Sequence, residues 1–178
     1  HKGAFEGCVE LESVNIPKPL NDIAPGAFKG CNKLTQMSLP YSLKSVGENM
    51  CEGSSLVVNG DLNIIPNNFL LNCKSITKLT FNTPVAEIGD YAFKETGLGV
   101  IELPRSVQKF GLGIFEGCVE LTIEGDITEI PRNAFKGCKT LQKLSLGGNI
   151  QSILSGAFDG CTALKRISIQ ENCTSIQE

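Results

Sequence analysis

The stretch Ala27-Phe28-Lys29-Gly30-Cys31, followed by Leu34-Thr35-Gln36-Met37-Ser38-Leu39 and Pro40, decides the fold of this chain. Its first five residues recur along the sequence, as Ala4-Phe5-Glu6-Gly7-Cys8, Ala134-Phe135-Lys136-Gly137-Cys138 and Ala157-Phe158-Asp159-Gly160-Cys161. Ile114-Phe115-Glu116-Gly117-Cys118 differs only in its first residue, whereas Ala92-Phe93-Lys94-Glu95-Thr96 keeps the phenylalanine and loses Gly-Cys. In two degenerate copies, Cys51 and Leu70 take the Phe position.

The copies are evenly spaced. Their Phe positions are residues 5, 28, 51, 70, 93, 115, 135 and 158, separated by 23, 23, 19, 23, 22, 20 and 23 residues. A period of this size marks a repeat architecture. Any three consecutive spacings add up to about 65 residues, which indicates duplication of a three-repeat unit. A single repeat cannot bury its apolar face alone, so we expect the repeats to stack as coils around a shared core.

Each repeat predicts a short strand. The last three residues of Leu-x-x-Ile-x-Leu alternate between apolar and polar, which is typical of a half-buried strand, and proline often follows, as at Pro17, Pro40 and Pro104. The segment before Ala-Phe predicts a helical turn or 3₁₀ piece. We therefore predict an α/β-type repeat solenoid of about eight coils, built mainly from short parallel strands with turns or 3₁₀ pieces. It forms one domain, residues 1–178, and a fragment of a longer array.

The repeat resembles the BspA-type leucine-rich repeat, which occurs in surface proteins of bacteria and of some parasitic protists. That family carries Ala-Phe-x-Gly-Cys-x-x-Leu-x-x-Ile-x-Leu-Pro, and the resemblance covers essentially the whole chain. The copies with Cys51, Leu70 and Thr96 depart from the pattern. The resemblance implies surface display or secretion, adhesion, and a protein or matrix ligand.

Composition narrows the function classes. The chain has 178 residues, with Lys+Arg 16 against Asp+Glu 19 and a net charge of −3, so it lacks the basic face that nucleic-acid binding needs. No apolar run approaches the roughly 20 residues that span a bilayer, so we expect no direct membrane insertion in this fragment. The chain opens inside a repeat, with no signal segment.

Six of the eight cysteines share one repeat position, namely Cys8, Cys31, Cys73, Cys118, Cys138 and Cys161. Stacking predicts an inward ladder of thiols. Disulfides between stacked neighbours are within reach, but parallel side chains suit the required dihedral poorly. Cys51 and Cys173 also fit core positions. No CxxC pair indicates a zinc or redox motif.

The sequence has few side chains that could act in catalysis. His1 is the only histidine and tryptophan is absent. Carboxylates such as Glu102, Glu124 and Asp126 are scattered through exposed repeat positions, and the glycine-bearing turns lack the Rossmann context. We predict a protein that is not an enzyme and that takes no cofactor and no metal.

The outward face of the strands is the candidate binding surface. One expected column contains Asn15, Ser38, Thr80, Ser145 and Ser168, interrupted by Glu102, and another becomes basic through Lys143, Lys165 and Arg166. An ordinary solvated sheet face is the alternative. The predicted site residues are Gln36, Ser38, Lys78, Thr80, Glu102, Lys143, Ser145, Lys165, Arg166 and Ser168. Without a Tyr/Trp/Arg cluster, a partner would bind weakly or across many repeats.

Two function classes follow: a surface-exposed or secreted interaction module, and a structural spacer that holds a distal domain away from an anchor. An intracellular scaffold is a third, supported by the thiols. Asn172-Cys173-Thr174 matches a glycosylation acceptor. Uncapped end coils would also permit end-to-end self-association.

Overall fold

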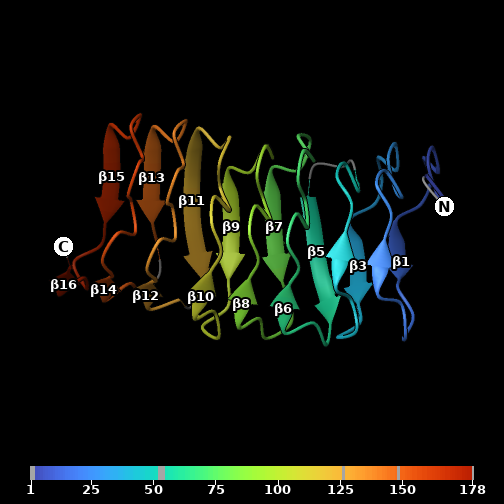
Figure 1. Ribbon diagram of the computed structural model, residues 1–178, viewed down its shortest axis with the longest axis horizontal. Coiled ribbons are helices and arrows are strands. Elements are labelled where there is room, and N and C mark those ends of the chain that lie inside the picture. The colour runs from blue at the N-terminus through green and yellow to red at the C-terminus, as the bar shows by residue number, and fades with distance from the viewer. Residues whose placement is uncertain (1–2, 52–54, 126, 148, 178) are drawn as a thin grey trace.

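The chain winds into a solenoid whose longer strands form one parallel sheet (Figure 1). The structure is a computed structural model that describes residues 3–51, 55–125, 127–147 and 149–177. The main sheet takes one strand from each repeat, in chain order: β1 (Ser13–Asn15), β3 (Gln36–Leu39), β5 (Ser55–Gly60), β7 (Lys78–Phe81), β9 (Val100–Leu103), β11 (Glu120–Gly125), β13 (Lys143–Leu146) and β15 (Arg166–Ile169). The eight strands match the eight predicted repeats, and seven turns of the solenoid connect the first strand to the last.

Two strands are longer than the rest and shift the pairing register. β5 and β11 have six residues each, whereas the other main-sheet strands have three or four. The second part of β5 pairs with β3, with Val57 opposite Gln36, and its first part pairs with β7. β11 bridges β9 and β13 in the same way. Equivalent repeat positions therefore slide by two residues at each long strand. Because strand side chains alternate with a period of two, the same face stays buried.

A second set of two-residue strands runs along the solenoid and is interrupted twice. These strands are β2 (Asp22–Ile23), β4 (Ser45–Val46), β6 (Ile64–Ile65), β8 (Glu87–Ile88), β10 (Lys109–Phe110), β12 (Glu129–Ile130), β14 (Ser152–Ile153) and β16 (Ser175–Ile176). They group as β2-β4, β6-β8-β10 and β12-β14-β16. Among the described residues, β4 does not pair with β6, nor β10 with β12.

Proline explains both interruptions. In regular coils, the residue after the short strand donates its N–H to the preceding coil, as Gly47 does to the Ile23 carbonyl at 2.8 Å and Leu154 to the Ile130 carbonyl at 2.9 Å. Pro66 and Pro131 hold this position after β6 and β12, and proline has no N–H. Both follow a long strand of the main sheet. We call residues 51–69 and 115–134, which contain β5 and β11, the short coils.

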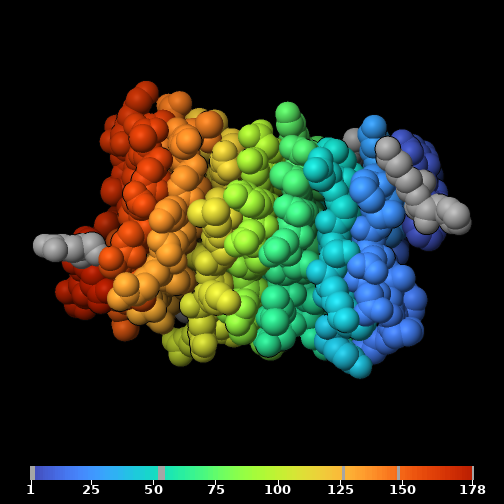
Figure 2. Space-filling model, in the orientation of Figure 1, coloured from blue at the N-terminus to red at the C-terminus, as the bar shows by residue number. Residues whose placement is uncertain are grey.

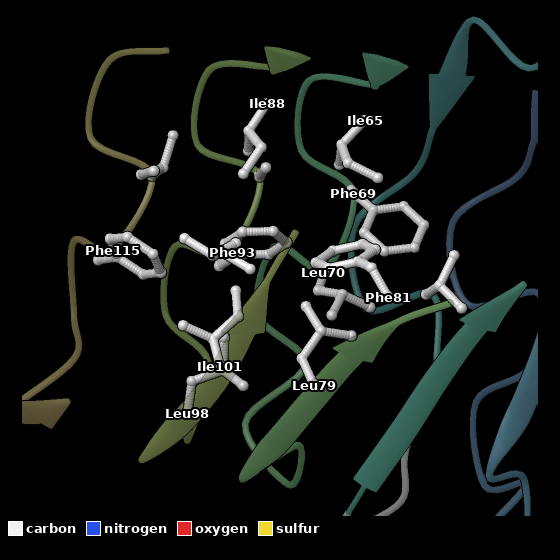
Figure 3. Close-up of a cluster of buried hydrophobic side chains, with 14 of the residues drawn as sticks. Ile65, Phe69, Leu70, Leu79, Phe81, Ile88, Phe93, Leu98, Ile101 and Phe115 are labelled. Atoms are coloured by element: carbon white, nitrogen blue, oxygen red, sulfur yellow. The ribbon is translucent and has the colours of Figure 1, made fainter. Parts of the chain in front are cut away.

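One apolar core runs through all the coils, and Figure 3 shows part of it in the middle of the solenoid. The rings of Phe93 and Phe115 lie 5.7 Å apart, and those of Phe115 and Phe135 lie 5.2 Å apart. Figure 3 shows Leu70 next in this line, with Phe69 beside it. All of these side chains are buried. The line of rings is therefore interrupted at Cys51 and Leu70 and resumes with Phe28 and Phe5, whose centroids are 5.2 Å apart.

The α/β assignment is wrong, because the described residues contain no helix. The segment around Ala-Phe forms turns, one of the two predicted forms, and the described residues contain no 3₁₀ piece. Positive φ angles bracket seven of these turns, as at Gly26 (65°) and Gly30 (76°), or Asn68 (61°) and Asn72 (64°). Left-handed residues four positions apart stop a right-handed helix before it can complete one turn.

The coils form successive bands along the molecule (Figure 2). The first and last coils each have a neighbour on one side only, so Phe5 is 47% exposed and Ile176 is 68% exposed. Phe93 and Phe115, in interior coils, are fully buried. End-to-end self-association remains a prediction.

Candidate binding face

The outward side chains of the main sheet form the candidate binding face. Gln36, Lys78, Lys143 and Arg166 are exposed, and Thr80 is half-buried. Of the ten predicted site residues, nine lie in strands of this sheet and Lys165 directly precedes β15. None of the ten is buried, and no other element in the described part of the chain forms a layer over this face.

The predicted hydrogen-bonding column is wrong because the long strands shift the register. Asn15 and Ser38 do lie in one column, which continues to Asn59. Thr80 instead belongs to a second column with Gln36, Val57, Glu102 and Glu124. Ser145 and Ser168 belong to a third, with Thr122, Val100 and Lys78. The structure thus brings the residues of the predicted hydrogen-bonding column to one face but distributes them over three staggered columns.

Ion pairs neutralise the middle of this face. Lys78 contacts Glu102 at 2.7 Å, and Lys143 contacts Glu120 at 2.6 Å. Lys78 donates a hydrogen bond to Glu102, and this bond raises the pKa of the Lys78 ammonium. Both pairs are solvent-exposed, so each stabilises the fold only slightly. The carboxylates of Glu102 and Glu120 are therefore already paired with lysines of the same chain.

The C-terminal end of the face keeps its positive charge. Arg166 lies opposite Lys143 in the neighbouring strand. Lys165 reaches the side-chain oxygen of Gln142 at 3.5 Å, a neutral partner. Within the described ranges, neither Lys165 nor Arg166 forms an ion pair. The predicted basic patch therefore exists, with Lys165 and Arg166 as its uncompensated charges.

The repeated cysteine has a structural contact. The Cys31 thiol donates to the Phe5 carbonyl oxygen at 3.2 Å, and the Cys161 thiol donates to that of Phe135 at 3.1 Å. All eight cysteines are thiols, and Cys31, Cys51, Cys73, Cys118 and Cys138 are buried as expected. Cys8 is exposed and Cys161 half-buried, because they lie in the first and last coils. The sulfur thus satisfies a carbonyl of the preceding coil as well as filling the core.

Thiol acidity follows these surroundings. Burial raises the pKa of Cys118 to about 11, although its hydrogen bond with Thr96 opposes the shift. A hydrogen bond between Cys138 and Cys161 raises the pKa of the buried Cys138 and lowers that of Cys161. These changes in thiol pKa are explained by burial and by contacts between neighbouring side chains in the core.

The described residues hold no group of three or more His, Cys, Asp or Glu side chains placed to bind a metal ion. His1 and Asp126 lie outside the described residues. Over the same ranges, the structure contains no helix with the length and apolar character to cross a membrane. Asn172 is exposed in a turn, and its glycosylation remains a prediction.

Sequence reasoning missed Gly60 and Gly125, which end the two long strands. Their φ angles are 107° and 97°. A Cβ on Gly60 would lie 2.2 Å from the Leu39 carbonyl oxygen, and one on Gly125 would lie 2.2 Å from that of Leu103. The similar endings Val58-Asn59-Gly60-Asp61 and Ile123-Glu124-Gly125-Asp126, each followed by an Ile-Pro pair, were the available signal.

Comparison with known proteins agrees with the repeat. The sequence profile of the BspA type leucine rich repeat region, in six copies, matches residues 1–122 and 101–178. No curated protein matches the chain.

Several solved structures are similar to the chain. A leucine-rich repeat protein from Bacteroides ovatus is 24% identical, with a TM-score of 0.41, and the match covers 99% of this chain and 59% of that one. A leucine rich cell surface protein from Faecalibacterium prausnitzii is 22% identical, with a TM-score of 0.35 and coverage of 93% and 62%. The pneumococcal vaccine antigen PcpA is 16% identical, with a TM-score of 0.46 and coverage of 95% and 63%. This chain therefore spans less than two thirds of each.

Proposed function

Because this chain belongs to the BspA-type leucine-rich repeat family, we propose that it is a non-catalytic protein-interaction module that binds its partner through the main-sheet face. The supporting observation is the continuous eight-stranded sheet, whose outward side is lined with polar side chains. Solenoids commonly bind through extended surfaces of this kind.

The charge distribution indicates where a partner makes its strongest contact. Glu102 and Glu120 are already paired with lysines of this chain, and Glu124 is the remaining exposed carboxylate of the central strands in the described part of the chain. Lys165 and Arg166 carry charges that no described carboxylate neutralises. An acidic segment of a protein ligand would complement this end, because arginine binds carboxylates in a bidentate manner.

We place this module at the cell surface or in the secreted fraction, with adhesion to a protein or matrix ligand as its role. The placement rests on the family resemblance. One similar structure is described as a cell surface protein and another as a vaccine antigen, which are statements about those proteins.

A solid-phase assay tests the proposal. The purified chain would be applied to immobilised fibronectin, laminin and collagen, and to intact epithelial cells. Saturable binding to at least one surface is expected, and the Lys165→Ser/Arg166→Ser double variant should weaken it about tenfold or more. The matched control is Arg132→Ser/Lys139→Ser, which removes the same two residue types from exposed turns outside the strands. Equal losses in both variants, or no binding to any surface, would contradict the proposal.

The ion pairs favour a second candidate, a rigid spacer. Lys33–Glu10, Lys94–Glu116 and Lys109–Glu87 join adjacent coils, at 2.6, 3.0 and 3.2 Å. Such pairs stiffen the array without offering charge to a partner. In a full-length parent protein, deletion of one three-coil unit would then abolish function, while the Lys165→Ser/Arg166→Ser variant would not. The opposite pattern would exclude the spacer role.

A further inference from the structure

Cys51 and Cys73 bring two sulfurs together inside the core. Their Sγ atoms lie 3.8 Å apart, and both residues are 1% exposed. Cys73 occupies the usual cysteine position of its repeat. Cys51 occupies the Phe position, as its bridge to Phe28 of the preceding coil shows. No other repeat of the sequence has sulfur at the Phe position.

The different origin of the two cysteines matters for their geometry. Cysteines in equivalent positions of adjacent coils have nearly parallel Cα–Cβ bonds and a spacing set by the strands, about 4.8 Å. A disulfide prefers a Cβ separation of roughly 3.5–4.5 Å and side chains that turn toward each other. Cys51 and Cys73 come from non-equivalent positions, and the thiol of Cys51 donates a hydrogen bond to the sulfur of Cys73. Among equivalent cysteines, Cys138 and Cys161 also share a hydrogen bond at the last coil, whereas the sulfur of Cys118 contacts the Thr96 hydroxyl instead.

Cys51 also faces a route of access. It lines a cavity of about 530 Å³ together with Asn32, Asn49, Asn72, Lys74 and Ser75. The other lining residues are polar, and the Lys74 ammonium favours an anionic reagent or a thiolate nearby. A small reagent entering this cavity reaches Cys51 first and Cys73 behind it.

We propose that Cys51 and Cys73 form a reversible disulfide that links the first short coil to the next coil, with a low-molecular-weight disulfide as the oxidant. The Cys51 thiolate attacks one sulfur of the reagent, forms a mixed disulfide and expels one reagent thiolate. The Cys73 thiolate then attacks the Cys51 sulfur and expels the second. The protein loses two electrons and two protons, the reagent gains them as two thiols, and excess dithiol reverses the exchange.

The disulfide would lie where the core lacks stacked aromatic rings. The line of stacked rings is interrupted at Cys51 and Leu70, so this part of the core lacks the ring-on-ring contacts seen between Phe93, Phe115 and Phe135. The disulfide would close the loop between residues 51 and 73 and restrict the unfolded chain. Oxidation therefore would stiffen the array where its core packing changes.

Peptide mapping of the intact chain provides the test. The chain would be incubated with glutathione disulfide, alkylated without reduction and digested with trypsin. Lys44 and Lys74 bound a tryptic peptide, residues 45–74, that contains only these two cysteines. Cleavage before Asp61 then separates Cys51 from Cys73 unless they are bonded. We expect the two pieces to stay linked and to separate after reduction.

Cys118 and Cys138 are the internal control, because both are buried and hold equivalent positions in adjacent coils. Much less linkage is expected between them. Separation of the two pieces without reduction would overturn the proposal. So would linkage of Cys118 to Cys138 in comparable yield, since buried sulfurs would then couple without regard to geometry.

Thermal unfolding gives a second readout. Oxidation should raise Tm by about 5–10 °C, as expected for a loop of this length in a chain of this size. Cys73→Ala should abolish the increase, whereas Cys31→Ala, which removes another buried thiol, should retain it. An increase that persists in Cys73→Ala would overturn the assignment, and the mapping of the unaltered chain stands even where a variant folds poorly.

Discussion

The two short coils, residues 51–69 and 115–134, share the same backbone path but have different core side chains. Each contains a six-residue strand, β5 or β11, and each ends that strand on a glycine with positive φ. Each also contains a proline directly after its two-residue strand, Pro66 or Pro131, where the second set of strands is interrupted. Yet the Phe position holds Cys51 in the first and Phe115 in the second.

This comparison separates what sets the path of the chain from what stabilises it. The register shift is the same in both coils although one lacks the aromatic ring, so coil length, glycine and proline determine the path. The rings determine packing. Phe115 stacks between Phe93 and Phe135, whereas Cys51 contacts Cys73. We therefore expect changes at glycine to have equal effects in the two coils and changes at the Phe position to have unequal effects.

The largest effect should come from removing the ring of the second short coil. Phe115→Ala leaves a cavity between two buried rings and should lower the free energy of unfolding by about 3–5 kcal/mol. Cys51→Ala removes one sulfur and should cost about 1 kcal/mol. Chemical denaturation of both variants would measure the difference. Similar losses would mean that the Phe position contributes equally in the two coils, contrary to this comparison.

The two strand-ending glycines provide the next effect. Gly60→Ala and Gly125→Ala each place a Cβ against a carbonyl oxygen at 2.2 Å, in a backbone conformation that alanine rarely adopts. Both should lose about 2–4 kcal/mol. Gly137→Ala is the matched control, since its φ is 78° but its Cβ would meet nothing within 4 Å. It should lose only about 1 kcal/mol. A loss at Gly60 very different from that at Gly125 would break the equivalence of the two coils.

A smaller effect depends on pH and concerns Cys118 of the second short coil. Burial raises the pKa of Cys118 to about 11 from an unfolded value near 9.0, so the unfolded state releases this proton first as pH rises. The stabilisation is complete below pH 9 and should be lost between about pH 9 and 11, amounting to about 2–3 kcal/mol.

Denaturation at pH 8 and pH 10.5 would measure this dependence, with Cys118→Ala as the control. The difference between the unaltered chain and the control should shrink as pH rises. A constant difference would show that Cys118 ionises equally in both states. The first short coil has Ser54 at the cysteine position of its repeat.

The smallest effect concerns the exposed ion pair that joins the second short coil to its neighbour. Lys143→Met removes the contact with Glu120 at 2.6 Å. Because both side chains are exposed, the loss should be about 0.5 kcal/mol or less. Thermal unfolding at low and high salt would measure it. A loss above about 1 kcal/mol would mean that surface ion pairs, and not the core alone, stabilise the contact between these coils.

The sequence predicted the number of main-sheet strands and most of the core, because the period and the alternation of apolar residues are local signals. Pro40 and Pro104 were correctly predicted to follow strands β3 and β9. The positive φ angles of the turns around each Phe were not predicted: Tyr91 and Glu95 have φ angles of 55° and 56°, and neither residue type indicates this. Their conformation follows from stacking on glycine-containing turns in neighbouring coils.

The outward position of the candidate face residues on the sheet was predicted, but the columns that they form were not. Aligning equivalent repeat positions placed Ser38 beside Thr80, whereas pairing through β5 places Ser38 beside Asn59. Pairing is a non-local property, and a two-residue slip leaves the apolar pattern unchanged. The Ile-Pro pairs at Pro66 and Pro131 would have located the interruptions if the missing N–H had been considered.

Hydrogen exchange tests the central claim, that the short coils divide the second set of strands into blocks. The amides of Glu87 and Ser152 donate to the preceding coil. Those of Ile64 and Glu129, at the equivalent position in the short coils, have no backbone acceptor in the described part of the chain. Measured by NMR on the intact chain, Ile64 and Glu129 should exchange at least about tenfold faster than Glu87 and Ser152. Equal protection at all four amides would contradict the division.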